Sequence, residues 1–354
     1  MPKRVLMTGN EAIGEAAIRA GCDAYYGYPI TPQNEITAYM ALHMPESNRI
    51  FIQAESEIAA INMVFGTAAA GKRAMTSSSS PGISLKQEGI SFLAGAELPA
   101  VIVNVQRGGP GLGNIAPSQA DYFQATKGGG HGDYHQIVLA PDSVQEMHDL
   151  TIKAFILAEK YRTPVMILTD GRLGQMMEPL TLYKGRPPVM PQKKWAINGA
   201  RNRKPNFIRS LYLVEGELEA LNIKLQKKYA DIRQNEIQWE ERLTKDCDVL
   251  LVAYGTSARI AKGAISSARA AGIRAGLLRP ITLWPFPYEK ISRLAERLKG
   301  ILVVEMSSGQ MLEDVKLAVN GKVPVFFEGR MGGGVPQESV LMKRIKRISK
   351  RKHG

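Results

Sequence analysis

The chain has 354 residues, which is long for one domain, so we expect about two domains, each with its own core. Apolar residues make up 44% and charged residues 22%, a balance that excludes a mostly disordered chain. The formal net charge is +13, and seven of the positive charges lie between Lys343 and Lys352 without an acid among them. A basic tail of this kind is typical of a solvated end, and less often of a docking site for an acidic partner or nucleic acid.

The cysteine content and the apolar pattern restrict the class of protein further. Cys22 and Cys247 are the only cysteines, which excludes a disulfide framework and any CxxC pair for zinc or an iron–sulfur cluster. Any cluster chemistry would therefore need another chain. The first residues lack the apolar core of a signal peptide, and no apolar run reaches the ~18 residues of a membrane span. We expect a soluble, cytoplasmic protein.

Short β-like runs alternate with helical patterns through the first 180 residues. We predict helices at 11–21, 57–70, 85–94 and 144–157, and strands at 24–28, 50–54, 100–105 and 165–168. Largely apolar strands that alternate with helices indicate a parallel sheet covered on both faces, and such sheets bind ligands at the carboxyl ends of their strands. Thr31, Glu57, a predicted loop at 77–82 and Arg107 all fall just after predicted strands, which is the first indication of a site.

The chain changes character after residue 183. Residues 184–209 interleave basic residues with prolines and are typical of a linker, and an apolar stripe from Leu218 to Ile232 predicts a helix. From Asp248 a second series of strands and helices predicts a small sheet of about four strands. The predicted organisation is a domain at 1–183, a basic linker and helical connector at 184–245, and a second doubly wound domain at 246–354 with the basic tail.

Several common catalytic motifs are missing from the sequence. The glycine-rich segment 108–113 does not match GxGxxG, and there is no P-loop, so a flexible loop is favoured over a phosphate cradle. The five histidines show no HExxH or HxH spacing for a metal site, and no GxSxG elbow predicts a serine hydrolase.

Glu55 and Glu57 precede an alanine-rich, largely apolar helix. A carboxyl group at the mouth of such a helix should lose part of its hydration, and it could then exchange a proton with a heterocyclic nitrogen. The alternative is an acid at a helix N-terminus that merely interacts with the helix dipole. Composition alone favours the second interpretation.

The chain as a whole resembles the α subunits of 2-oxoacid:ferredoxin oxidoreductases. The resemblance rests on motifs that occur in family order: Gly27–Pro32, Gln53–Ala60, Thr76–Gly82, Gln106–Pro110 and Ser143–Asp149. The variant forms at Ser77–Ser80 and Gly108–Asn114 are most similar to the branched-chain enzyme, which acts on 2-oxoisovalerate (3-methyl-2-oxobutanoate).

The resemblance implies a thiamine diphosphate enzyme with a pyrimidine-binding N-terminal domain and a transketolase C-terminal-like second domain. Family members carry a glutamate nine residues before a helix glycine, and Gly66 lies nine residues after Glu57, so the cofactor-activating role falls on Glu57. Thr31 and Arg107 match positions that hold the substrate carboxylate; the alternatives are a loop hydroxyl bonded to nearby backbone and a surface salt bridge. Ser78 and Ser79 would line the cofactor side of the pocket.

The resemblance also implies a division of labour between chains. The diphosphate-binding domain with its Mg²⁺ would lie on a β subunit, and [4Fe-4S] clusters on partner subunits, including γ and ferredoxin-like δ subunits. The complex would decarboxylate a 2-oxoacid oxidatively, reduce ferredoxin and pass the acyl group to coenzyme A. Alternatives are a 2-oxoglutarate, pyruvate or indolepyruvate enzyme, or a noncatalytic assembly subunit; nucleic-acid binding is remote. The sequence leaves open the exact 2-oxoacid, the subunit stoichiometry, the electron acceptor, the physiological direction and the role of the tail.

Overall fold

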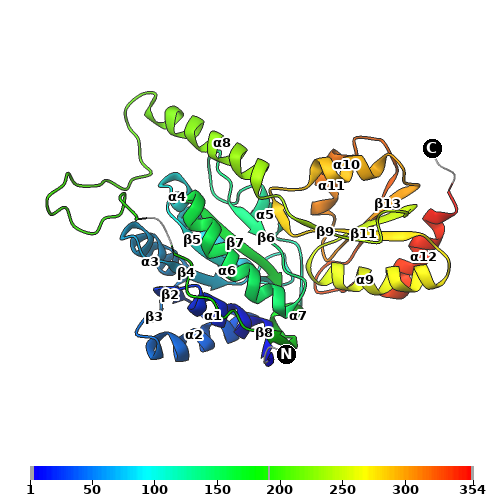
Figure 1. Cartoon of the computed structure of the whole chain (residues 1–354), viewed down its shortest axis with the longest axis horizontal. Helices are drawn as coiled ribbons and strands as arrows, with labels where there is room; N and C mark the ends of the chain where they lie inside the picture. The colour runs from blue at the N-terminus through cyan, green and yellow to red at the C-terminus, as the bar shows by residue number, and fades with distance from the viewer. Residues whose placement is uncertain (1–3, 190–191, 352–354) are drawn as a thin grey trace.

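The computed structural model describes residues 4–189 and 192–351, which form two α/β units joined by a long connection (Figure 1). The helices are α1 (Gly9–Arg19), α2 (Asn34–Glu46), α3 (Glu57–Ala69), α4 (Ser80–Gly95), α5 (Tyr122–Thr126), α6 (Val144–Tyr161), α7 (Gly171–Gln175), α8 (Glu217–Asn235), α9 (Gly255–Ala270), α10 (Tyr288–Ala295), α11 (Gln310–Val319) and α12 (Glu338–Ser349). The strands are β1 (Arg4–Thr8), β2 (Ala24–Gly27), β3 (Ile50–Gln53), β4 (Ala74–Ser78), β5 (Ala100–Gln106), β6 (Ile137–Leu139), β7 (Pro164–Asp170), β8 (Met177–Thr181), β9 (Trp239–Arg242), β10 (Val249–Val252), β11 (Ala275–Pro280), β12 (Thr282–Trp284), β13 (Gly300–Glu305) and β14 (Val325–Gly329).

The N-terminal unit is built on a seven-stranded sheet in the order β12-β6-β7-β5-β4-β2-β3. Six of its strands run parallel, and β12, which comes from the C-terminal half of the chain, joins antiparallel to β6. Strands β4, β5 and β7 are buried along their whole length, as expected for a sheet with helices on both faces. The sheet presents the carboxyl ends of β5, β4, β2 and β3 side by side at one edge.

The C-terminal unit has a five-stranded sheet in the order β14-β13-β10-β11-β9. The sequence predicted about four strands; the additional strand is β9, which is mostly exposed and runs antiparallel to β11. Helices α9 and α12 pack together on this sheet and share a core with it, built on residues such as Leu251, Ile265 and Leu302. The prediction of an α/β fold with mainly parallel sheets is confirmed.

Two local predictions were wrong, and one pair of strands was not predicted. Residues 77–82 are no loop: Ser77 and Ser78 end β4, and α4 already begins at Ser80, because a proline in the first helical turn has no intrahelical hydrogen bond to lose. The helix predicted from Glu11 begins two residues earlier, where Thr8 and Glu11 form a reciprocal capping box. The small antiparallel pair of β1 and β8 was not predicted, because each strand finds its partner more than 160 residues away.

The linker and the tail take different forms. The described residues between 182 and 216 form no helix or strand. The first part lies against the N-terminal unit, where Lys193 pairs with Glu159 and the Ile197 amide donates to the Ala69 carbonyl at 2.8 Å. The chain then loops away from the body of the molecule before α8 returns to the N-terminal unit (Figure 1). The tail forms α12, which buries Leu341, Ile345 and Ile348 and leaves most of its basic side chains at the surface; Lys352 lies outside the described residues. None of the helices that the structure describes is both long and apolar enough to cross a bilayer.

The two units share a buried polar joint. Arg279 at the end of β11 lies 2.6 Å from Glu146 of α6 and 2.7 Å from Glu240 of β9. Gln119 of the N-terminal unit donates to the Tyr254 carbonyl at 2.8 Å and accepts from the Ser257 hydroxyl at 2.7 Å. Because buried polar groups must find partners with correct geometry, this joint fixes the second unit against the first.

Replacing Arg279 with Met should destabilise the protein by about 3 kcal/mol, because Glu146 loses its cation, whereas Glu240 keeps Lys262 at 2.9 Å. The matched control is Arg293→Met, which breaks an exposed pair with Glu289 at 2.9 Å and should cost less than about 1 kcal/mol. Denaturant unfolding of both variants measures the difference. Equal losses in the two variants would contradict the structural importance of the joint.

Candidate active site

Five polar residues follow four neighbouring strands of the N-terminal sheet. Thr31 lies in the loop after β2, Glu57 opens α3 after β3, Ser78 and Ser79 lie at the end of β4, and Arg107 follows β5. Strands β5, β4, β2 and β3 are adjacent and parallel, so their carboxyl ends lie at the same edge. The structure therefore brings all five predicted site residues to the edge where open α/β sheets bind ligands.

Glu57 is the first residue of α3 and is only 5% exposed, whereas Glu55 is exposed. The Ser56 hydroxyl caps the helix by accepting from the Ala59 amide at 3.1 Å, which holds Glu57 at the helix mouth. The Glu57 carboxyl packs against Gly82 of α4, where the Cβ of any other residue would overlap Glu57 Oε1 and Ser78 Oγ. No residue that the structure describes makes a hydrogen bond with this carboxyl, so its oxygens are free to accept from a ligand.

The serines beside Glu57 are also without partners. The hydroxyls of Ser78 and Ser79 are buried, and neither makes a hydrogen bond within the described residues. A buried hydroxyl without a partner costs free energy, so these two groups indicate a polar ligand or a partner chain at this point.

Arg107 is a buried cation without a counter-ion. Its Nη1 donates to the Thr31 carbonyl at 2.9 Å and its Nη2 to the Leu112 carbonyl at 2.8 Å, while Nε has no partner. No carboxylate lies within 4.0 Å of the guanidinium among the residues described, which argues against the surface salt bridge considered as the alternative. Since a buried charge is costly unless it is paired, the guanidinium points to an anionic ligand.

Thr31 lies beside Arg107, because its backbone carbonyl accepts the hydrogen bond from Arg107 Nη1. Its side chain is half-buried, and Thr31 Oγ1 accepts from Asn34 Nδ2 at 3.2 Å. The hydroxyl proton of Thr31 is therefore still free to be donated to a ligand.

Lys86 is a charged group of this site that the sequence analysis missed. Its side chain is fully buried in α4, and Nζ donates to Thr76 Oγ1 at 2.8 Å and to the Ser77 carbonyl at 2.9 Å. Burial lowers the pKa of Lys86 to about 7, and the nearby charge of Glu57 acts in the opposite direction. The signal was present in the sequence: Lys86 lies four residues after Gly82 and four before Ile90, on the buried stripe of the helix.

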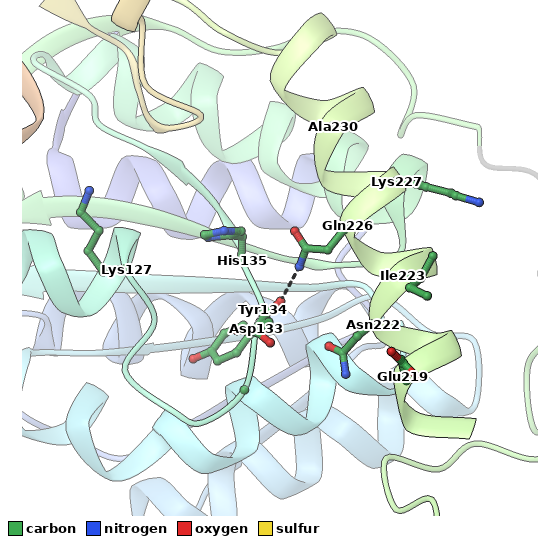
Figure 2. A pocket seen from close by; sticks show the side chains of 11 residues that line it. Lys127, Asp133, Tyr134, His135, Glu219, Asn222, Ile223, Gln226, Lys227 and Ala230 are labelled. Atoms are coloured by element: carbon green, nitrogen blue, oxygen red, sulfur yellow. Dashed lines mark hydrogen bonds between the residues drawn. The ribbon is translucent and has the colours of Figure 1, made fainter. Parts of the chain in front are cut away.

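The described structure has a surface cavity away from these residues, between α8 and the segment before β6 (Figure 2). This surface cavity has a volume of about 680 Å³, and Gln226 reaches across it to donate to the Asp133 carbonyl at 2.9 Å. His135 at its wall stacks on Trp284 at 4.6 Å, and burial lowers the pKa of His135 to about 4, so the ring is neutral. None of the five predicted site residues lines this cavity. The charges without counter-ions, Glu57 and Arg107, lie at the carboxyl ends of β3 and β5 instead.

Two family models together cover most of the chain. Residues 15–236 match the thiamine diphosphate-binding domain of pyruvate flavodoxin/ferredoxin oxidoreductase, and residues 247–339 match core domain II of pyruvate:ferredoxin oxidoreductase.

The chain is similar to subunits of two enzymes from Methanothermobacter species. The chain is 55% identical over 344 residues to ketoisovalerate oxidoreductase subunit VorB of Methanothermobacter marburgensis, with 97% of each chain covered. It is 37% identical over 377 residues to 2-oxoglutarate synthase subunit KorA of Methanothermobacter thermautotrophicus, covering 99% of this chain and all of the relative.

Solved structures agree with these relatives. The 2-oxoglutarate:ferredoxin oxidoreductase from Magnetococcus marinus, with 2-oxoglutarate, coenzyme A and succinyl-CoA bound, superposes with a TM-score of 0.84 at 26% identity, covering 99% of this chain and 66% of that one. A split-gene transketolase shares the fold at a TM-score of 0.62. The chain belongs to the 2-oxoacid:ferredoxin oxidoreductases of the thiamine diphosphate-dependent pyruvate flavodoxin/ferredoxin oxidoreductase family, and it is a subunit of such an enzyme.

The buried amine of Lys86 should make the free energy of unfolding depend on pH. Its pKa lies near 7 in the folded chain and near 10.5 when unfolded, so between these values only the unfolded chain holds the proton. Stability should therefore rise with pH by about 1.4 kcal/mol per pH unit from pH 7 upward, relative to a Lys86→Met variant that has no amine. Denaturant midpoints of both proteins at pH 7, 8 and 9 measure this, and parallel pH dependences would contradict a buried amine.

Proposed function

We propose that the chain is the α subunit of a thiamine diphosphate-dependent ketoisovalerate:ferredoxin oxidoreductase. With its partner subunits it oxidatively decarboxylates 3-methyl-2-oxobutanoate, transfers the acyl group to coenzyme A, releases CO₂ and reduces ferredoxin. The single observation that carries this proposal is the pair of buried charges, Glu57 and Arg107, which lack counter-ions at one sheet edge. A heterocyclic cofactor and a carboxylate substrate supply the two missing partners.

The site residues fit the pyrimidine end of the cofactor. Thiamine diphosphate, when bound, supplies the carbanion centre that attacks the keto carbon of the substrate. Glu57 would hold a proton between its carboxyl group and a ring nitrogen, as a general acid–base group in a pocket with little water. The buried hydroxyls of Ser78 and Ser79 would hydrogen-bond to polar atoms of the cofactor ring or of the chain that covers it.

Arg107 and Thr31 would bind the substrate carboxylate. Two of the five N–H donors of Arg107 are used on backbone carbonyls, which fixes the plane of the guanidinium. The remaining donors can pair with a carboxylate, and the planar fork of arginine suits this geometry. The Thr31 hydroxyl lies on the loop after β2, whose backbone Arg107 contacts, and it would donate a further hydrogen bond.

Partner subunits would complete the active site. We place the diphosphate-binding domain and its Mg²⁺ on a β subunit, and the [4Fe-4S] clusters on partner subunits that include γ and δ chains. The open edge around Glu57 supports this division, because Ile58 of α3 and Leu85 of α4 are 49% and 50% exposed beside the site. The isolated chain would be inactive.

The branched acyl chain is supported by the 55% identity to the VorB subunits and by the loop beside Arg107. Leu112 and Ile115 on this loop are 78% and 65% exposed, and they offer apolar surface next to the guanidinium. The second candidate is 2-oxoglutarate, which the KorA relatives favour. Its distal carboxylate would need a further cation at the position where the loop offers Leu112.

Replacing Glu57 with Gln should reduce turnover of the reconstituted complex by about 10²–10⁴-fold, because the amide cannot exchange the proton. Assembly should be unchanged, since the side chains have the same shape. The measurement is ferredoxin reduction with 3-methyl-2-oxobutanoate and coenzyme A. Glu55→Gln is the matched control and should keep full turnover, because Glu55 is exposed; a Glu57→Gln complex with parental turnover would remove Glu57 from its role.

The substrate assignment predicts a higher kcat/KM for 3-methyl-2-oxobutanoate than for 2-oxoglutarate, pyruvate or indolepyruvate. Arg107→Gln should lower kcat/KM for every 2-oxoacid by about 10–100-fold, because each of them carries the carboxylate that Arg107 pairs with. Steady-state kinetics of the complex with each acid test both statements. A preference for 2-oxoglutarate would favour the second candidate, and turnover independent of Arg107 would displace it from the substrate site.

A further inference from the structure

A row of arginines lines a small cavity on the C-terminal unit. Arg344 and Arg347 lie on α12, and Arg351 follows two residues after the helix ends. Their spacings of three and four residues place the three side chains on one face. Together with Ile348 of α12 and Phe326 of β14 they line a cavity of about 220 Å³.

The cavity has an apolar floor and two arginines that are already held in place. Ile348 and Phe326 pack so closely over Gly300 of β13 that a Cβ at this glycine would overlap both side chains. The Arg351 guanidinium lies over the Phe326 ring, 5.4 Å from its centroid. Arg344 Nε lies 2.9 Å from Glu328 Oε2 of β14. The row is therefore ordered before any ligand binds.

The charge around this cavity is mostly uncompensated. Within the part of the chain that the structure describes, neither Arg347 nor Arg351 has a carboxylate within 4.0 Å, and both are exposed. Residues 338–351 contain a single acid, Glu338, and six basic residues: Lys343, Arg344, Lys346, Arg347, Lys350 and Arg351. Such a patch attracts anionic groups, and the planar fork of arginine suits carboxylates in particular.

The arginine row runs along the open edge of a sheet. Strand β14 pairs with β13 and has no second partner among the described residues, so one row of its backbone groups is left for another strand. Phe326 and Glu328 share the face of β14 that carries α12, because every second side chain lies on the same face. Arg344 lies beside Glu328, and Arg351 beside Phe326. A strand added to this edge would place alternate side chains beneath the arginines.

We propose that this edge is a docking site for an extended acidic segment of a partner subunit, which adds to β14 and pairs alternate carboxylates with Arg347 and Arg351. The two spacings match: four helical residues rise about 6 Å, and alternate residues of a strand are about 6.8 Å apart. The proposal rests on the membership of this chain in an enzyme of several subunits, and not on the roles proposed for Glu57 and Arg107. In Figure 1, α12 and α3 lie at opposite ends of the molecule, so docking leaves the active site open.

A phosphate ion or a nucleic acid would satisfy only part of this surface. Either could pair with the guanidinium groups. However, the open edge of β14 offers carbonyl acceptors as well as N–H donors, and a phosphate group has no N–H to donate to those carbonyls. A peptide strand supplies both kinds of backbone partner, and its acidic side chains supply the counter-ions.

The test uses the full chain and a fluorescein-labelled peptide of sequence Glu-Val-Glu-Val-Glu, with binding followed by fluorescence anisotropy. The double variant Arg347→Gln/Arg351→Gln should bind this peptide about tenfold more weakly or less, because two charge-assisted hydrogen-bond donors are lost. The matched control, Lys343→Gln/Lys346→Gln, removes the same charge from the same helix outside the cavity. At about 0.15 M salt it should change the affinity by no more than about twofold, because screening acts over about 8 Å.

A second peptide tests the backbone contacts. The same sequence with N-methylated backbone amides keeps its three carboxylates but loses its N–H donors, and it should bind at least about tenfold more weakly. Full affinity of this peptide, or equal losses in the two double variants, would overturn the proposal. So would a 20-base-pair DNA that binds through Arg347 and Arg351 when the peptide does not, or displacement of the peptide by millimolar inorganic phosphate.

The reconstituted complex gives the second readout. Arg347→Glu/Arg351→Glu should weaken the association of a partner subunit in gel filtration at least about tenfold, whereas Lys343→Glu/Lys346→Glu should keep it. The thermal midpoint of the isolated chain should stay at the parental value in both, because all four side chains are exposed. A charge-reversed complex of parental stability would contradict the docking site. Glu57→Gln should bind the peptide with parental affinity whatever its turnover, so this proposal and the proposed function fail separately.

Discussion

Glu57 and Arg107 are buried charges that the chain itself does not neutralise, and the organisation of the N-terminal unit follows from this constraint. Folding removes both groups from water and returns no counter-ion among the described residues, so the free chain carries an electrostatic cost at one edge of its sheet. The first turn of α4 holds the arrangement together: Gly82 admits the Glu57 carboxyl, and Ser80 Oγ accepts from the Arg107 amide at 3.0 Å. A ligand with a ring nitrogen and a carboxylate would pair with Glu57 and Arg107 and so offset this cost. The site therefore favours such ligands over others.

The second unit contributes to this edge indirectly. Strand β12 joins the N-terminal sheet beside β6, and Gln119, in the segment that follows Arg107, is bonded to Tyr254 and Ser257 of the second unit. The Asn114 side chain on the same segment donates to the Gly332 carbonyl at 3.0 Å. The loop that holds Arg107 is therefore fixed on one side by the sheet and on the other by the C-terminal unit.

The sequence was most informative where periodicity and position after a strand coincide. Alternating strands and helices predicted the two sheets. Because ligands bind at the carboxyl ends of parallel strands, the positions of Thr31, Glu57 and Arg107 just after strands predicted that they lie at one site. The pairing of β1 with β8 and of β12 with β6 could not be predicted, because each pair joins segments that are distant in the chain. The loop predicted at 77–82 failed because four serines and a proline are typical of a loop, yet the same residues cap and open a helix.

Lys86 shows why a buried charge is harder to predict than an exposed one. A lysine within an apolar stripe is read from sequence as a side chain that bends outward to water, because that is its usual behaviour. Here Ile83, Gln87 and Ile90 of α4 are buried around it, and the two oxygens of β4 take its protons. Only the packing of α4 on β4 and α3 closes the route to solvent. The chemistry of this site is thus fixed by a tertiary contact between one helix face and one strand end, and a charge-conserving exchange of Lys86 and Glu57 would not reproduce it, because only position 86 offers oxygens that accept from an ammonium group.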